Sequence, residues 1–226
     1  MKEELNEKLF HEFPALFESC YGSKPKDPLY YWGIQCGDGW YELVHSVSEL
    51  LTRHNPEIES EQIKEKFGGL RFYHTHGDDY ASGVVEMAGH ISFQICEACG
   101  DPGIKRDHDG YISTLCEKHK GRKSKAIGKD LAATTPIDDD IGNGWLRLIV
   151  ALKKIIKWDV EKNGMPPVVD LTIKKDNGQL HVEFSGGDQS TKGMVDLIIH
   201  YSKKIDEHSG HIITATIREK SNEIGS

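Results

Sequence analysis

A tetrapeptide that recurs with one residue changed is the feature that most restricts how this chain can fold. GDGW at residues 37–40 is matched by GNGW at 142–145, an offset of 105 residues. In both places apolar residues follow at helical spacing, which predicts amphipathic helices such as the one at 40–54. The repeat therefore predicts two related structural units within one chain.

The match continues beyond these helices at a slightly larger offset. At an offset of 110 residues, the aligned pairs include Ile63 with Ile173, Gly68 with Gly178, Leu70 with Leu180, Gly77-Asp78 with Gly187-Asp188, and His90 with His200. The five extra residues fall in the loop at 163–167, where an insertion is tolerated thermodynamically. We interpret this correspondence as an internal duplication.

Each copy is predicted to consist of a helix, a hairpin and a second helix. In the first copy a glycine pair separates the β-compatible runs 62–67 and 70–74, as in a hairpin. Apolar residues at helical spacing then predict a helix over 80–95. Residues 2–19 have helical spacing too, with an interruption near Pro14. The predicted fold class is α+β, with two tandem, related α-β-β-α lobes.

These lobes and the segments around them divide the chain into five predicted parts. They are an N-terminal helix packing on the first lobe (1–28), the first lobe (29–119), a basic and polar linker (120–138), the second lobe (139–219) and a disordered tail (220–226). The two halves are expected to diverge directly after the second helix. There the first lobe continues into a cysteine-containing loop at 96–119, whereas the second ends in an extra strand at 212–217.

The cysteine-containing loop has the spacing of a zinc knuckle. Cys96 and Cys99 are separated by two residues, sixteen residues follow, and Cys116 and His119 are again separated by two. Two such pairs can give zinc four tetrahedral ligands, and a thiolate-rich set with no open position favours a structural site over a catalytic one. The sequence therefore predicts structural Zn²⁺ at these four residues.

Composition describes an ordinary folded protein and favours a reducing compartment. The 226 residues are 37% hydrophobic and 28% charged, with neither an apolar signal-type start nor an apolar run long enough for a membrane span. Five cysteines, three of them in the zinc pattern, fit the cytoplasm better than a disulfide framework. We therefore expect a cytoplasmic protein, in the host cytoplasm if it is encoded by a phage.

Charge counts against general nucleic-acid binding, although one local stretch is basic. The net charge is −8, whereas attraction to phosphates needs a basic face. The basic residues around the end of the zinc loop are Lys118, Lys120, Arg122, Lys123, Lys125 and Lys129. A solvated linker is the preferred interpretation of this stretch, and a nucleic-acid contact is the alternative.

A second candidate cluster consists of alternating histidines followed by carboxylates. His74, His76, Asp78 and Asp79 would suit a metal-dependent hydrolase if they bound an ion together. In the second lobe, however, only the Gly-Asp pair recurs, because Phe184 and Gly186 stand where the histidines would be. A recurring Gly-Asp pair indicates a turn and a helix cap, so this is the preferred interpretation.

The first hairpin is the predicted ligand surface. The candidate residues for binding an anionic ligand are Lys64, Lys66, Arg71, Tyr73, His74 and His76. An exposed hairpin that binds nothing is the simpler alternative. Trp40 and Trp145, which occupy the same place in the two copies, are interpreted as core anchors at helix starts.

Three motifs together resemble a widespread family of small, poorly characterised phage and bacterial proteins. They are CGDGW at 36–40, IKEKFGGLRFY at 63–73 and CxxCGxPG at 96–103, so the resemblance covers about residues 29–119. The resemblance implies zinc binding and an accessory role, such as anti-defence in the conflict between phages and hosts. It implies no particular activity, and the second lobe departs from the pattern because it lacks the cysteine motif.

The preferred function is that of a non-catalytic, zinc-stabilised binding protein. It would capture a host or phage protein or a small anionic signal. The chain contains no phosphate-binding glycine loop, no Gly-x-Ser-x-Gly elbow and no Cys/His nucleophile pair, so catalysis has no positive indication. The alternatives are a nucleic-acid-binding zinc knuckle and the metal-dependent hydrolase described above.

Overall fold

The computed structural model describes residues 1–21, 33–132 and 141–213. The described chain combines helices with small antiparallel sheets, which confirms the predicted α+β class. At the N-terminus, α1 (Glu3–Glu12) is followed after one residue by α2 (Pro14–Tyr21), as expected from the proline. Proline is favoured at the first position of a helix because it has no N–H to satisfy there. Leu9 and Leu16 of these helices are buried in the core.

The same order of elements occurs twice. In the first lobe the 3-10 turn η2 (Asp38–Trp40) leads into α3 (Tyr41–His54), β1 (Glu59–Lys66), β2 (Gly69–Thr75) and α4 (Asp79–Ser92). In the second lobe α5 (Asn143–Trp158) and the π-helical turn η3 (Asp159–Asn163) precede β6 (Val168–Asp176), β7 (Gln179–Gly186) and α6 (Gln189–Ser202). The two hairpins also share their register, because Lys64 pairs with Arg71 and Lys174 pairs with His181.

The two repeated tryptophans are core anchors, as the sequence predicts. Trp40 is fully buried and its indole Nε1 donates to the Ile95 carbonyl at 2.9 Å. Trp145 is also buried, and its Nε1 donates to the Ser202 carbonyl at 3.1 Å. Each indole therefore joins the start of the first helix of its lobe to the region where the second helix ends.

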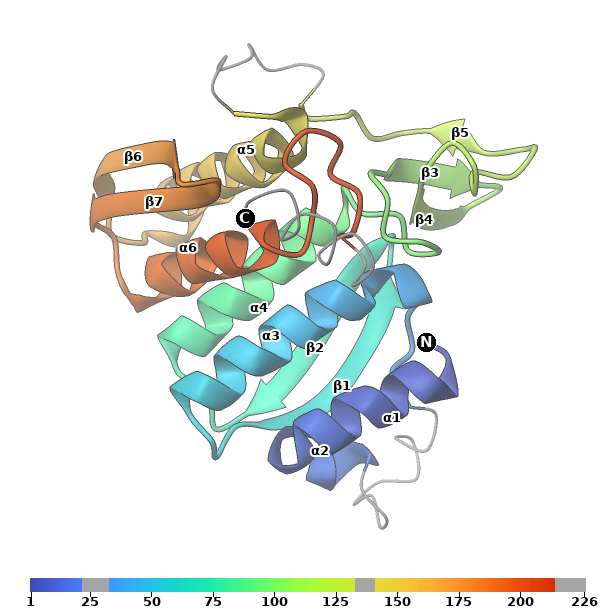
Figure 1. Cartoon of the computed structure of the whole chain (residues 1–226), viewed down its shortest axis with the longest axis horizontal. Helices are drawn as coiled ribbons and strands as arrows, with labels where there is room; N and C mark the ends of the chain where they lie inside the picture. Colours follow the sequence, from blue (N-terminus) through green and yellow to red (C-terminus); the bar gives the residue numbers. More distant parts are fainter. Residues whose placement is uncertain (22–32, 133–140, 214–226) are drawn as a thin grey trace, which may run out of the picture.

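The lobes share one hydrophobic core, centred on the packing of α4 against α6 (Figure 1). Two glycines allow these helices to approach closely. A Cβ on Gly83 would lie 2.0 Å from the Ser190 carbonyl oxygen, and a Cβ on Gly193 would lie 2.2 Å from the Tyr80 carbonyl oxygen. Gly193 and Ser190 are the residues aligned with Gly83 and Tyr80, so each lobe contacts the other through the same positions.

A third sheet follows α4 in the chain and was not predicted. β3 (Ile104–His108), β4 (Tyr111–Leu115) and β5 (Lys125–Ala126) form the order β4-β3-β5, where the sequence indicated only turns and a linker. β5 belongs to the segment predicted as a linker, and it pairs with β3 through Arg106 and Asp107. The strands are too short for their alternation to stand out in the sequence.

Part of the predicted C-terminal region lies outside the described residues. Of the extra strand predicted at 212–217, only Ile212 and Ile213 are described, and Ile212 forms a bridge with Ile205. The predicted tail at 220–226 and the end of the predicted linker also lie outside them.

Candidate metal centre

A tight turn after α4 presents the first two ligands. In this cysteine turn (residues 95–102), Cys96 N–H donates to the Asp101 carbonyl at 2.7 Å, and Gly100 N–H donates to the Cys96 carbonyl at 2.8 Å. Gly100 has a φ of 82°, a left-handed conformation that favours glycine. The backbone therefore holds Cys96 and Cys99 on one side of a closed loop.

The second ligand pair follows β4. The strand delivers Cys116, and His119 N–H donates back to the Cys116 carbonyl at 3.2 Å. The two loops are tied together because Glu97 N–H donates to the Thr114 carbonyl at 2.9 Å. The β3–β4 hairpin, which was not predicted from the sequence, thus places Cys116 and His119 beside Cys96 and Cys99.

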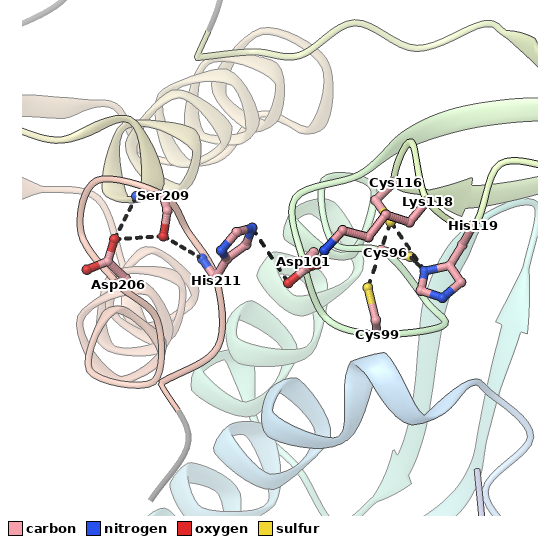
Figure 2. A network of polar contacts seen from close by, with 9 residues as sticks. All are labelled: Cys96, Cys99, Asp101, Cys116, Lys118, His119, Asp206, Ser209 and His211. Carbon is pink, nitrogen blue, oxygen red and sulfur yellow. Dashed lines mark hydrogen bonds and ion pairs between the residues drawn. The ribbon is translucent and has the colours of Figure 1, made fainter. Parts of the chain in front are cut away.

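The four side chains converge as a possible metal site (Figure 2). Cys99 Sγ lies 3.8 Å from Cys116 Sγ, and His119 Nδ1 lies 3.7 Å from Cys96 Sγ and 3.3 Å from Cys116 Sγ. All four donor atoms lie within 4.8 Å of one another. Zinc with Zn–S bonds of about 2.3 Å in a tetrahedron would separate two sulfurs by about 3.8 Å, whereas a disulfide needs about 2.05 Å. The spacing fits shared coordination of an ion.

The thiols of this cluster differ in acidity. Burial raises the pKa of the Cys116 thiol, but hydrogen bonds from the His119 side chain and backbone outweigh burial and bring this pKa from 9.0 down to about 7. Burial and the neighbouring Cys96 thiol raise the pKa of Cys99. Several thiolates at these separations repel one another, so a bound cation is what would allow all of them to lose their protons.

A buried arginine supports the second ligand pair. The Arg106 side chain is only 5% exposed, its Nε donates to the Leu115 carbonyl at 3.2 Å, and its guanidinium forms an ion pair with Glu117. Glu117 lies between Cys116 and His119 in the sequence, so this pair fixes the loop between the two ligands. A buried guanidinium is costly without such partners.

The second lobe contains the same turn without the cysteines. In this serine turn (residues 205–212), Gly210 N–H donates to the Asp206 carbonyl and Asp206 N–H donates to the His211 carbonyl, both at 2.8 Å. Asp206 and Ser209 replace the two cysteines, and the Ser209 N–H and hydroxyl each lie 2.7 Å from Asp206 Oδ1 (Figure 2). The expectation that the halves diverge directly after the second helix is therefore wrong, because the backbone pattern continues through this turn.

The two turns also contact each other. Asp101 and His211 occupy aligned positions, and Asp101 Oδ1 lies 3.7 Å from His211 Nε2 (Figure 2). The other Asp101 oxygen lies 3.7 Å from Lys118 Nζ in the second ligand loop. Asp101 thus links the cysteine turn to the ligand loop and to the second lobe.

The histidine and carboxylate cluster of the hydrolase hypothesis is not assembled. Among residues 1–21, 33–132 and 141–213, the Cys96, Cys99, Cys116 and His119 set is the one group of three or more side chains placed to share a metal ion. Asp78 instead caps α4 by accepting from Ala81 N–H at 3.0 Å, and it also contacts His54 Nε2 at 2.8 Å. Asp188 caps α6 in the same way. The predicted turn and cap are confirmed.

The six predicted ligand residues of the first hairpin do not share one surface. Pairing of Lys64 with Arg71 and alternation along both strands place Lys64, Lys66, Arg71 and Tyr73 on one face. His74 belongs to the opposite face and its Nδ1 is buried, and His76 lies beyond β2 in a left-handed conformation with a φ of 58°. The structure therefore brings four of the six together.

Two residues that the sequence reasoning missed extend this surface. The Phe93 ring has two cations near it: Arg71 Cζ lies 6.0 Å and Lys105 Nζ lies 4.1 Å from the ring centroid. We call the set Lys64, Lys66, Arg71, Tyr73, Phe93 and Lys105 the cationic face. Lys105 joins this surface because β3 packs beside the end of α4, where its Nζ contacts the Phe93 ring. No spacing in the sequence links Lys105 to the β1–β2 hairpin.

The cations of this face lack acidic partners. Within the described part of the chain, no carboxylate lies within ion-pair distance of Lys64, Lys66, Arg71 or Lys105. Burial and the neighbouring Arg71 charge lower the pKa of Lys105. Lys64 Nζ instead lies 5.5 Å from the Tyr73 ring. Like charges therefore lie close together here without neutralisation.

The aligned position in the second lobe is neutralised. Lys174, which corresponds to Lys64, lies 3.1 Å from Glu183, and Glu183 stands where the first lobe has Tyr73. The second hairpin also replaces Arg71 with His181. The excess of positive charge is therefore a property of the first hairpin alone.

Comparisons with known proteins add no relative. No protein-family model matches the chain, and no match was found among curated proteins or among solved structures. Among the described helices, none combines the length and the apolar character that crossing a membrane requires.

Proposed function

We propose that the Cys96, Cys99, Cys116 and His119 cluster binds a structural zinc ion, as a zinc knuckle. Three thiolates and one imidazole are a donor set that suits zinc, and four protein ligands leave no position for a substrate. When bound, the ion would hold the cysteine turn against the β3–β4 hairpin. Zinc ligation needs the three cysteines as reduced thiols, so the proposal places the protein in the cytoplasm, where thiols stay reduced.

The proposal includes an internal duplication. The repeated order of elements, the common hairpin register and the matching turns at 95–102 and 205–212 all support it. The reciprocal contacts of Gly83 and Gly193 are those expected when two copies of one unit pack through a two-fold relationship.

We further propose that the chain is a non-catalytic binding protein whose ligand is anionic and lies on the cationic face. The contrast between Lys64 and Lys174 carries this proposal: the same position is unpaired in one lobe and neutralised by Glu183 in the other. An anion would supply the missing charge and relieve the repulsion between Arg71 and Lys105. It could be a small anionic signal or the acidic surface of a host or phage protein, in keeping with an accessory, anti-defence role.

Binding of two anionic probes tests the proposal. Pyrophosphate represents a small signal, and an aspartate-rich peptide represents an acidic protein surface. We expect calorimetry to detect binding of one of them, and Arg71→Gln or Lys105→Gln to weaken it about tenfold, the effect of losing one charged hydrogen bond. Lys174→Gln is the matched control and should leave the affinity unchanged.

Two results would contradict the proposal. One is the absence of heat with either probe at millimolar concentration. The other is equal weakening by Lys174→Gln, which would indicate a general charge effect rather than a site.

Nucleic-acid binding is the second candidate, favoured by exposed aromatic rings beside lysines. The Phe67 side chain is 61% exposed with Lys66 Nζ 5.5 Å from its ring, and Tyr73 is 43% exposed. Such rings can stack on bases of a single strand. The net charge of −8 counts against this candidate. A single-stranded oligonucleotide that binds with an affinity falling steeply with salt would favour it.

A further inference from the structure

A pocket of about 400 Å³ opens beside the cysteine turn. The residues of its wall that matter here are Glu97, His108, Tyr111, Ser113 and Leu115. Ser113 pairs with Arg106 across the β3–β4 hairpin, so alternation along β3 puts Lys105 on the opposite face. This side pocket is therefore separate from the cationic face, and an inference about it does not depend on the proposed function.

Polar atoms without partners line the side pocket. The Ser113 side chain is buried, with the residue 5% exposed, and its hydroxyl has no hydrogen-bond partner among the described residues. His108 Nε2 is also buried and has no partner within the same part of the chain. Buried polar groups are nearly always hydrogen-bonded, so a ligand that reaches both atoms would gain by satisfying them.

In the second lobe the aligned carboxylate has an ion pair, whereas Glu97 has none among the described residues. Glu97 and Glu207 correspond, and each carboxylate accepts from the backbone N–H of an aligned glycine, at 2.9 Å from Gly37 and 3.2 Å from Gly142. Glu207 also forms an ion pair with Lys175 at 2.6 Å. In the first lobe the residue aligned with Lys175 is Glu65, so a carboxylate replaces the ammonium.

The rest of the pocket is compatible with a cation and not with an anion. Tyr111 donates its hydroxyl to Glu65 Oε2 at 3.1 Å, and its ring, in a side chain 61% exposed, offers an aromatic surface. Arg106 lies on the same face of β3, but Glu117 already neutralises it. No lysine or arginine is among the described residues that line the pocket.

We propose that the side pocket binds an organic cation, a primary ammonium group on an apolar stem. The ammonium would take the place that Lys175 Nζ occupies beside Glu207 in the second lobe. Its three N–H donors match three acceptors of the wall, namely the Glu97 carboxylate, the Ser113 hydroxyl and the Nε2 atom of His108. The stem would lie along Leu115 and the Tyr111 ring, where a cation–π contact adds to the attraction.

Calorimetry on the purified full-length chain tests this proposal with three probes. Nα-acetyl-lysine methylamide represents a lysine side chain of a protein, and n-butylamine represents a free amine. The third probe, the same lysine derivative acetylated at Nε, keeps the stem and removes the charge. We expect one of the cationic probes to bind and the neutral probe to bind at least about tenfold more weakly, since it lacks the charge-assisted contact. The tighter cationic probe identifies the source.

Two variants and a matched control localise the binding. Glu97→Gln keeps an acceptor for Gly37 N–H and should weaken the cationic probe about tenfold, and Ser113→Ala should weaken it several-fold. Glu207→Gln, at the aligned position, should have no effect. Equal affinity for charged and neutral probes, absence of binding by both amines, or unchanged affinity in Ser113→Ala would each overturn the proposal. The neutral probe and Ser113→Ala keep the test decisive even if Glu97→Gln impairs folding.

Discussion

Gly83 of α4 packs against α6, and the aligned Gly193 of α6 packs against α4 in the same way. Neither residue has room for a methyl group. The nearest carbonyl oxygens, those of Ser190 and Tyr80, would lie 2.0 and 2.2 Å from an added Cβ. The shared core of the two lobes therefore depends on the absence of side chains at these two residues, since close packing tolerates little added volume.

Replacing Gly83 by alanine is expected to force α4 and α6 apart. Overpacking of this kind costs about 1–3 kcal/mol or more, and Gly193→Ala should cost about as much. Thermal unfolding provides the measurement. Gly89→Ala is the control in the same helix, because its Cβ would lie at an ordinary 3.4 Å from the Leu70 carbonyl and alanine favours a helix by up to about 1 kcal/mol. A Gly83→Ala protein as stable as Gly89→Ala would contradict the packing described here.

Removal of the metal is expected to destabilise the first lobe. Native mass spectrometry should find one ion per chain, and Cys116→Ser should lose it. Loss of a structural zinc should remove several kcal/mol of a total that is typically about 5–15 kcal/mol, with a large fall in Tm. Ser209→Ala, in the serine turn, should cost only about 1 kcal/mol and leave the metal content unchanged. A metal-free chain that unfolds at the same temperature would contradict the zinc proposal.

Asp78 and Asp188 are expected to behave as equivalent helix caps. Substituting either by alanine removes a hydrogen bond to an N-terminal N–H of α4 or α6 and should cost about 1 kcal/mol in the free energy of unfolding. Chemical denaturation measures the change, and metal analysis accompanies it. If Asp78→Ala also changed the metal content, the hydrolase hypothesis would regain support.

Mild acid is expected to destabilise the protein through His200. Burial lowers the pKa of this residue, Glu49 at 3.0 Å partly opposes the shift, and Lys204 and Lys203 reinforce it. Because the folded pKa lies below the unfolded value of about 6.5, the stabilising effect is complete above that pH and is lost as the pH falls through the folded pKa. Tm should therefore fall between about pH 7.5 and pH 5.5. His200→Gln should reduce this fall, and an unchanged pH dependence in the variant would show that other groups cause it.

The repeat made much of the fold predictable. Apolar spacing indicated both helix pairs, and glycine pairs or turns indicated the hairpins, because period and turn chemistry are local properties. The strands Ile104–His108 and Tyr111–Leu115 escaped prediction because they are short and are stabilised by contacts with distant segments. Thr114, for example, donates its hydroxyl to the Gly68 carbonyl at 2.6 Å, 46 residues away.

The candidate sites divide in the same way. The spacing of Cys96, Cys99, Cys116 and His119 was visible because ligand pairs are local motifs. Lys105 and Ser113 could not be identified in this way, because the ring contact of Lys105 and the pocket lined by Ser113 form only when β3 and β4 pack beside the cysteine turn. The replacement of Lys175 by Glu65 at the aligned position can be read from the sequence. That Lys175 forms an ion pair with Glu207, which makes this replacement informative, is known only from the structure.

The serine turn and the cysteine turn differ in their sensitivity to oxidants and chelators. Asp206 and Ser209 close their loop with oxygen and nitrogen atoms, which peroxide and chelators leave untouched. The cysteine turn closes beside three sulfur atoms that oxidants modify. Under the zinc proposal, oxidation of these sulfurs would therefore release the ion and loosen the cysteine turn, while the serine turn keeps its hydrogen bonds.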